Sequence, residues 1–142
     1  MVFKKMVDGD LVAGRAYFIG REEFLKWDIS GIISLSGEAR GMVSISMKTE
    51  TALRITEHLT GIKHTYLNGD VIDAIGEMVN VVTGNVKKDL QGIVNLVISL
   101  PYVIKGKAHT IALPLESKQL LCIPFEIFEN QMIYLSVAIS KA

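Results

Sequence analysis

Apolar and polar residues alternate along residues 29–47 in a pattern that predicts two β-strands with one buried face. Two runs have a period of two residues on either side of Ser36–Glu38, a segment with the composition of a tight turn. Their apolar members are Ile29, Ile33 and Leu35 in the first run and Val43, Ile45 and Met47 in the second. The pattern therefore predicts a β-hairpin.

The same period returns in the second half of the chain. Apolar and polar residues alternate over 94–100, and Pro101 closes this strand or marks an irregularity in it. A less regular segment over 105–115 is expected to add another strand. Two further runs predict a closing hairpin across a turn at 129–130. Their apolar members are Leu121, Ile123, Phe125 and Ile127, then Ile133, Leu135, Val137 and Ile139. Pro124 in the first of these runs indicates an edge or a bulge.

Between these strands the period changes to that of an α-helix. Residues 48–59 predict a helix of about three turns, with Thr49 as its N-cap and Gly61 as its stop. Its expected buried side consists of Ala52, Ile55, His58 and Leu59. A longer helix is predicted over Asp70–Leu90, with Asp70 at its N-cap. The apolar arc of this second helix consists of Val71, Ala74, Ile75, Met78, Val79, Val82 and Val86.

Hairpins followed by two helices and further hairpins predict an α+β fold, with an antiparallel β-sheet built from hairpins and packed against two central helices. Residues 1–26 are the least regular part, and the segment VFKKMV at 2–7 predicts only a short helix or the remnant of an N-terminal helix. The pattern contains no interdomain linker and no internal repeat. Residues 1–142 are therefore expected to form a single domain.

Composition narrows the classes of function. Fifteen basic residues balance fifteen acidic ones, so charge indicates neither nucleic-acid binding nor attraction to an anionic membrane. The first ten residues carry charge where a signal peptide needs an apolar stretch, and no apolar run reaches about eighteen residues. We therefore expect a soluble cytoplasmic protein. Cys122 lies among apolar neighbours and is expected to be a buried, inert thiol.

Common cofactor and hydrolase signatures are missing from the sequence. The three histidines, His58, His64 and His109, match no metal-ligand spacing. Neither a glycine-rich phosphate loop nor a G-x-S-x-G motif occurs. The sequence therefore predicts no metal centre and no cofactor of its own.

The long helix carries a polar face that its burial does not require. At about 100° per residue, four residues fall within about 60° of one another on this face. They are Asp73, Glu77, Asn80 and Gly84. The helix dipole alone explains an acid at Asp73, in the first turn, and a solvated surface residue is the ordinary role of Glu77.

Asn80, Gly76 and Gly84 are harder to explain by helix stability. Asparagine in mid-helix costs about 0.5 kcal/mol relative to alanine, and each glycine costs about 1 kcal/mol. These residues indicate a flat polar surface on which the side chains of Glu77 and Asn80 can reach another molecule. Because helices also tolerate glycines for packing reasons, a partner surface and a packing role are both open at this point.

The spacing of Asp73, Glu77 and Asn80, with Pro101 downstream, resembles the signature of the CheC and CheX family of chemotaxis phosphatases. Three longer segments resemble the strand, helix and closing-hairpin segments of CheX in the same order; they are residues 27–47, 77–85 and 120–139. CheC-type members commonly carry the motif twice, whereas residues 49–59 contain no Glu-x-x-Asn. The resemblance therefore implies a CheX-like fold with a single site.

This resemblance implies dephosphorylation of a CheY-type response regulator, which carries its phosphoryl group on an aspartate. Hydrolysis needs a water in line with phosphorus and positive charge on the equatorial oxygens, and the regulator's own Mg²⁺ and lysine can supply that charge. Asn80 would position the water, and Glu77 would pair with the regulator's lysine. Asp73 would support the helix start or the rim of the interface, and Gly76 and Gly84 would let the partner approach.

The resemblance also implies a homodimer joined through its sheets, with the closing strands supplying an apolar edge. Two other classes of protein stay open. A non-catalytic docking module would bind a response regulator or a flagellar switch component through the same helix face, without turnover. A sensor domain would need an enclosed ligand cavity, which the dense apolar patterning does not indicate.

Overall fold

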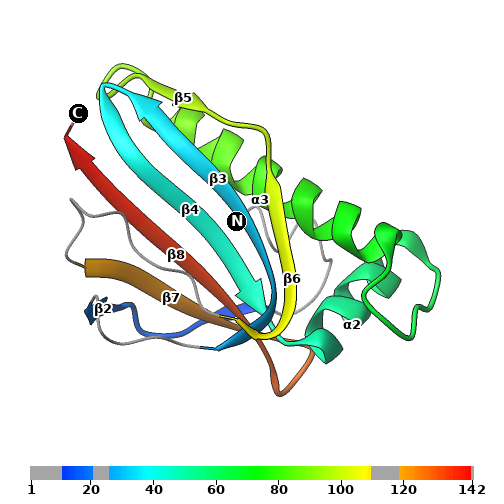
Figure 1. The fold of residues 1–142 in the computed structure, drawn as a ribbon. Coiled ribbons are helices and arrows are strands. Elements are labelled where there is room, and N and C mark those ends of the chain that lie inside the picture. Colours follow the sequence, from blue (N-terminus) through cyan, green and yellow to red (C-terminus); the bar gives the residue numbers. More distant parts are fainter. Residues whose placement is uncertain (1–10, 21–25, 110–118, 142) are drawn as a thin grey trace.

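The computed structural model describes residues 11–20, 26–109 and 119–141, which form an antiparallel sheet with two helices on one of its faces (Figure 1). The strands are β1 (Leu11–Ala13), β2 (Tyr17–Gly20), β3 (Trp27–Gly37), β4 (Ala39–Met47), β5 (Leu96–Ile98), β6 (Tyr102–His109), β7 (Gln119–Ile127) and β8 (Gln131–Lys141). The helices are α2 (Thr49–Thr60) and α3 (Gly69–Asp89). This arrangement confirms the predicted α+β fold.

Six of the eight described strands follow one another across the sheet in the order β1–β7–β8–β4–β3–β5. Beyond this path, β2 also pairs with β7, and β6 also pairs with β3. The centre of the sheet thus consists of four long strands, and each of its two sides is completed by a pair of shorter ones. Among the described residues, no helix is long and apolar enough to cross a membrane.

Both predicted hairpins are present. In the first, Ile29 lies opposite Met47, and Gly37 takes a positive φ of 98° at the turn. In the closing hairpin, Phe125 lies opposite Ile133, and residues 128–130 all have positive φ values. Most of the predicted apolar residues lie in or against the helix-covered core, but Ile139, which was expected on the buried face, is 47% exposed.

The two short strand pairs each break at or opposite a proline. Strands β1 and β2 pair with β7 on either side of Pro124, whose carbonyl accepts a hydrogen bond from the Gly14 N–H at 2.7 Å. Strands β5 and β6 are separated by a segment that contains Pro101. Proline lacks the N–H that a continuous ladder needs, which explains both irregularities. Strand β6 consequently starts at residue 102, earlier than the predicted segment over 105–115.

The structure corrects the expected roles of the amino-terminal segment and the closing strands. Strands β1 and β2 were not predicted, and the helix expected at residues 2–7 lies outside the described residues. Because β1 and β2 pair with β7, and β8 lies between β7 and β4, the closing strands do not present a free edge. The prediction of a dimer edge on these strands is therefore wrong.

Helix α2 begins and ends through different contacts. Thr49 is not its N-cap, because Lys48 occupies that position without a capping side chain. Instead, Asp28 of β3 accepts hydrogen bonds from the N–H and the hydroxyl of Thr49, at 2.8 and 3.1 Å. Gly61 has a φ of 75° and stops the helix as predicted. His58 was expected on the buried side, but it is exposed near the ring of Phe128.

The start of helix α3 also differs from the prediction. Its N-cap is Asn68 rather than Asp70, because the Asn68 carboxamide oxygen accepts a hydrogen bond from the Val71 N–H at 3.1 Å. Asp70 lies in the first turn, where its negative charge is favoured by the helix dipole. The carboxamide nitrogen of Asn68 also bonds the Nδ1 of His64 at 2.9 Å, which ties the cap to the preceding loop.

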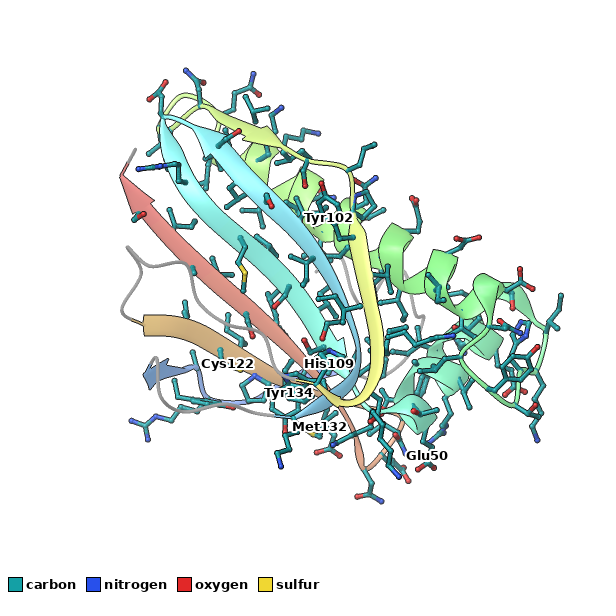
Figure 2. The ribbon with its side chains drawn as sticks, in the orientation of Figure 1. Glu50, Tyr102, His109, Cys122, Met132 and Tyr134 are labelled. Atoms are coloured by element: carbon teal, nitrogen blue, oxygen red, sulfur yellow. The ribbon has the colours of Figure 1, made fainter. Side chains whose placement is uncertain are left out.

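The opposite face of the sheet has a different character, with small polar and apolar side chains. Four serines are buried there: Ser30, Ser44, Ser46 and Ser136. The hydroxyl of Ser30 is hydrogen-bonded both to that of Ser46, at 2.7 Å, and to His109 Nε2, at 2.8 Å. Cys122 is fully buried on this side of the sheet, as predicted, and Figure 2 labels it together with His109.

Helix α3 lies very close to β3 at Gly31. A Cβ atom at this glycine would lie 3.0 Å from the Cγ1 of Val79 and 3.2 Å from the carbonyl oxygen of Ile75. Both residues are fully buried. The missing side chain therefore lets the helix backbone approach the sheet directly.

We expect Gly31→Val to lower the free energy of unfolding by about 1–3 kcal/mol, because the added methyl groups would push α3 away from β3. Urea denaturation of the variant and the wild type measures this change. Gly106→Val is the matched control, since Gly106 also lies in a strand and a Cβ there meets no atom within 4 Å. Equal losses of stability in the two variants would contradict the role given to Gly31.

Candidate functional site

Helix α3 separates its apolar and polar residues as its sequence predicts. Its buried apolar residues are Val71, Ile75, Met78, Val79 and Val82. On the outer side, Asp73 and Glu77 are exposed, and Asn80 and Gly84 are partly exposed. The structure therefore brings the predicted polar residues together on one accessible face of α3, which we call the polar face.

Two contacts hold the start of α3 in place next to this face. The first is the cap described above, which joins Asn68 to His64. In the second, the Lys105 ammonium of β6 donates a hydrogen bond to the carbonyl oxygen of Leu67 at 3.2 Å. Because these contacts come from outside the helix, the polar face sits on a rigid support rather than on a loop.

The side chains on the polar face are free of intramolecular partners. Within residues 11–20, 26–109 and 119–141, no hydrogen bond or ion pair involves the side chains of Asp73, Glu77 or Asn80. Asn85 in the same helix behaves differently, because its Nδ2 donates to the Val81 carbonyl at 2.8 Å. The carboxamide of Asn80 is thus available to a molecule outside the chain, whereas that of Asn85 is engaged.

Glu77 borders an open depression between α3 and β6. The depression has a volume of about 460 Å³, and its lining residues are Ile72, Asp73, Gly76, Glu77, Pro101 and Val103. Pro101, which follows Glu77 by 24 positions in the sequence, therefore lies at the same site. The depression extends the polar face sideways to the proline that the sequence pattern singled out.

The two glycines of α3 have different surroundings. Gly76 is buried, and a Cβ atom there would lie 3.4 Å from Val103 Cγ2 and 4.0 Å from Pro101 Cγ. These are ordinary van der Waals distances, so an alanine side chain would fit at this position against β6 and Pro101. A Cβ atom at Gly84 would meet no atom within 4 Å. Packing within the described residues gives no reason for a glycine at that position.

The chemistry available at the polar face is that of one carboxamide and two carboxylates. Among the described residues, no group of three histidines, cysteines, aspartates or glutamates is placed to hold a metal ion. A carboxamide can accept a hydrogen bond from a water and donate one to an oxyanion at the same time. Glu77 and Asn80, one turn apart, can therefore orient and pair with groups of a partner.

Comparison with known proteins shows a family match. Residues 29–126, well over half of the chain, match the family described as chemotaxis phosphatase CheX. This range contains most of β3, and all of β4, both helices and the polar face. Among curated proteins, no sequence matches the chain significantly.

Solved structures of similar fold include three chemotaxis-related proteins. CheX from Vibrio vulnificus is 29% identical, with a TM-score of 0.87 over 98% of this chain and 91% of that one. A CheC-like superfamily protein from Shewanella sp. PV-4 is 28% identical, with a TM-score of 0.86 over 98% and 90%. CheX in the CheX–CheY–BeF3–Mg²⁺ complex from Borrelia burgdorferi is 24% identical and resembles the chain in fold, with a TM-score of 0.83 over 99% and 91%.

Proposed function

The chain belongs to the CheX family of chemotaxis phosphatases, and we propose that it dephosphorylates the aspartyl phosphate of a CheY-type response regulator. The observation that carries this proposal is the pair Glu77 and Asn80, which lie on an accessible face of α3 near Pro101 and have no side-chain partner among the described residues. The CheX–CheY complex from Borrelia burgdorferi supports the choice of partner. Under this proposal the protein acts in the cytoplasm, where response regulators are phosphorylated.

Asn80 positions the attacking water. In the docked complex its carboxamide oxygen accepts a hydrogen bond from the water, and its NH2 group donates to an oxygen of the phosphoryl group. The water oxygen bonds to phosphorus as the bond from phosphorus to the aspartate oxygen breaks, and the water proton passes to the phosphate released. An amide is too weakly basic to act as a general base, so Asn80 contributes through orientation.

The partner supplies the positive charge that this reaction needs. The regulator's Mg²⁺ and active-site lysine stabilise the phosphoryl oxygens and the departing carboxylate, so this chain needs no cofactor of its own. Glu77 pairs with that lysine and sets the position of α3 along the regulator. Asp73 lies at the rim of the same contact, and Gly84 keeps the helix profile low beside Asn80.

We also propose that the protein forms a homodimer through the edge made by β5 and β6, in place of the closing strands. Both strands pair only with β3 among the described strands, so their outer side is free. Apolar side chains are exposed along this edge: Val97, Leu100, Tyr102 and Ile104. Tyr102, labelled in Figure 2, projects from β6 and is 61% exposed. An exposed apolar edge strand of this kind favours pairing with a second copy.

We expect Asn80→Ala to remove nearly all of the acceleration of phosphate loss, by about 10²-fold or more, because the water is no longer oriented. The measurement is the decay of phosphorylated CheY-type regulators from the same genome, with and without the protein. Binding to the regulator should change little. The matched control is Asn85→Ala, which removes an asparagine of the same helix whose side chain is already bonded to Val81.

The same measurement separates a phosphatase from a docking module. A wild-type protein that binds the phosphorylated regulator without changing its decay rate would identify a non-catalytic docking module. Unchanged activity in the double variant Glu77→Ala, Asn80→Ala would contradict the mechanism.

Glu77→Ala is expected to weaken binding of the phosphorylated regulator by about tenfold and to slow turnover as well, since an unpaired lysine remains in the complex. Titration of the regulator loaded with beryllium trifluoride and Mg²⁺ measures the binding. Glu57→Ala serves as the control, because Glu57 is an exposed glutamate on α2. If both variants bind like the wild type, Glu77 is not the anchor.

For the dimer, Ile104→Asp should convert the protein to a monomer in sedimentation equilibrium, because it places a charge in the apolar edge. Ile62→Asp is the control, since Ile62 is also exposed but lies in the loop between the helices. A wild-type protein that is monomeric at high micromolar concentration, or an Ile104→Asp variant that stays dimeric, would contradict an interface on this edge.

A further inference from the structure

The polar face of α3 continues past Gly84 to a lysine. Residues 73, 77, 80, 84 and 87 alternate spacings of four and three, so Lys87 lies on the same side of the helix as Glu77 and Asn80. Lys87 and its neighbour Lys88 are both exposed. The accessible side of α3 therefore changes from acidic near its start to basic near its end.

A second open groove lies at this basic end. Its volume is about 410 Å³, and its lining residues are Gly84, Lys87, Lys88, Gln91, Val94, Asn95 and Leu96. Gly84 thus belongs both to the polar face and to this groove. Because its missing side chain leaves open space, the two surfaces join without a barrier between them.

Hydrogen bonds hold the segment after α3 that lines this groove. The N–H groups of Ile93 and Val94 both donate to the carbonyl oxygen of Leu90, at 2.9 and 3.0 Å. Asn95 Nδ2 donates to the carboxylate of Glu38 at 2.7 Å, and the Glu38 N–H donates to the Asn95 carbonyl at 3.0 Å. The carboxylate next to the groove is therefore engaged with Asn95.

Both lysines are without an internal counter-ion. Within the described part of the chain, neither the Lys87 nor the Lys88 ammonium has a carboxylate within ion-pair distance. Lysines in the last turn of a helix are favoured by the helix dipole whatever else they do. The dipole does not explain why Gly84 opens a groove beside them.

We propose that this groove receives carboxylate side chains of the docked response regulator, and that Lys87 thereby fixes the direction in which α3 lies on its partner. This inference rests on the proposed function. Lys87 follows Glu77 by ten positions, which is about 15 Å along the helix axis. The proposal therefore requires the regulator to present an acidic group about 15 Å from the lysine that pairs with Glu77. With α3 reversed, Glu77 would face that acidic group and Lys87 would face the regulator's lysine, and both contacts would be repulsive.

Charge reversal at Lys87 tests this inference. We expect Lys87→Glu to slow association with the regulator loaded with beryllium trifluoride and Mg²⁺ by about tenfold at low salt, and to make association less sensitive to added salt. Lys87→Arg keeps the charge and should behave like the wild type. Lys63→Glu, at an exposed lysine between α2 and α3, is the matched control.

Two results would overturn the inference. One is equal association rates for Lys87→Glu and Lys63→Glu at every salt concentration. The other is a lower melting temperature for Lys87→Glu with unchanged association, which would leave only a role in helix stability. Either result is compatible with a working phosphatase, whereas an Asn80→Ala variant of full activity would remove the proposed function itself.

Discussion

The close approach of α3 to β3 at Gly31 determines how the rest of the structure presents the polar face. With Val79 and the Ile75 carbonyl against the strand, the helix cannot rotate about its axis without a clash. A rotation by one residue, about 100°, would turn buried valines outward and polar residues inward. Beside Gly76, Val103 of β6 and Pro101 lie next to the helix on a second side. The position of Asn80 is therefore set by the sheet as much as by the helix.

Periodicity was sufficient to predict the elements whose faces are buried over many residues. Both hairpins and the apolar arc of α3 appeared as predicted, since every second strand residue or every third to fourth helix residue must reach the core. Strands β1 and β2 were missed because three or four residues are too few to show a period. The cap of α2 was missed because Asp28 lies 21 positions before Thr49, and only the folded sheet brings them together.

In the candidate site too, features within one helix could be predicted, whereas features that depend on contacts between elements could not. The sequence predicted that Glu77 and Asn80 share one accessible face of a helix, because their spacing is visible within a single element. The different surroundings of Gly76 and Gly84 could not be predicted, since they depend on where β6 and the loop after α3 lie. The groove beside Lys87 was equally hidden, because Val94 and Asn95 line it only after the turn at the end of α3 has folded.

The absence of internal partners for the Asn80 side chain has a consequence for how this fold can change over generations. Its replacement breaks no contact within the described residues and removes no buried group, so selection for a stable fold does not protect it. If Asn80 positions the water as proposed, a lineage can lose turnover in one step and keep a protein that folds and binds as before. Under the proposed function, a single accessible amide separates enzymes from pure binding proteins on this scaffold, and only selection on signalling keeps it in place.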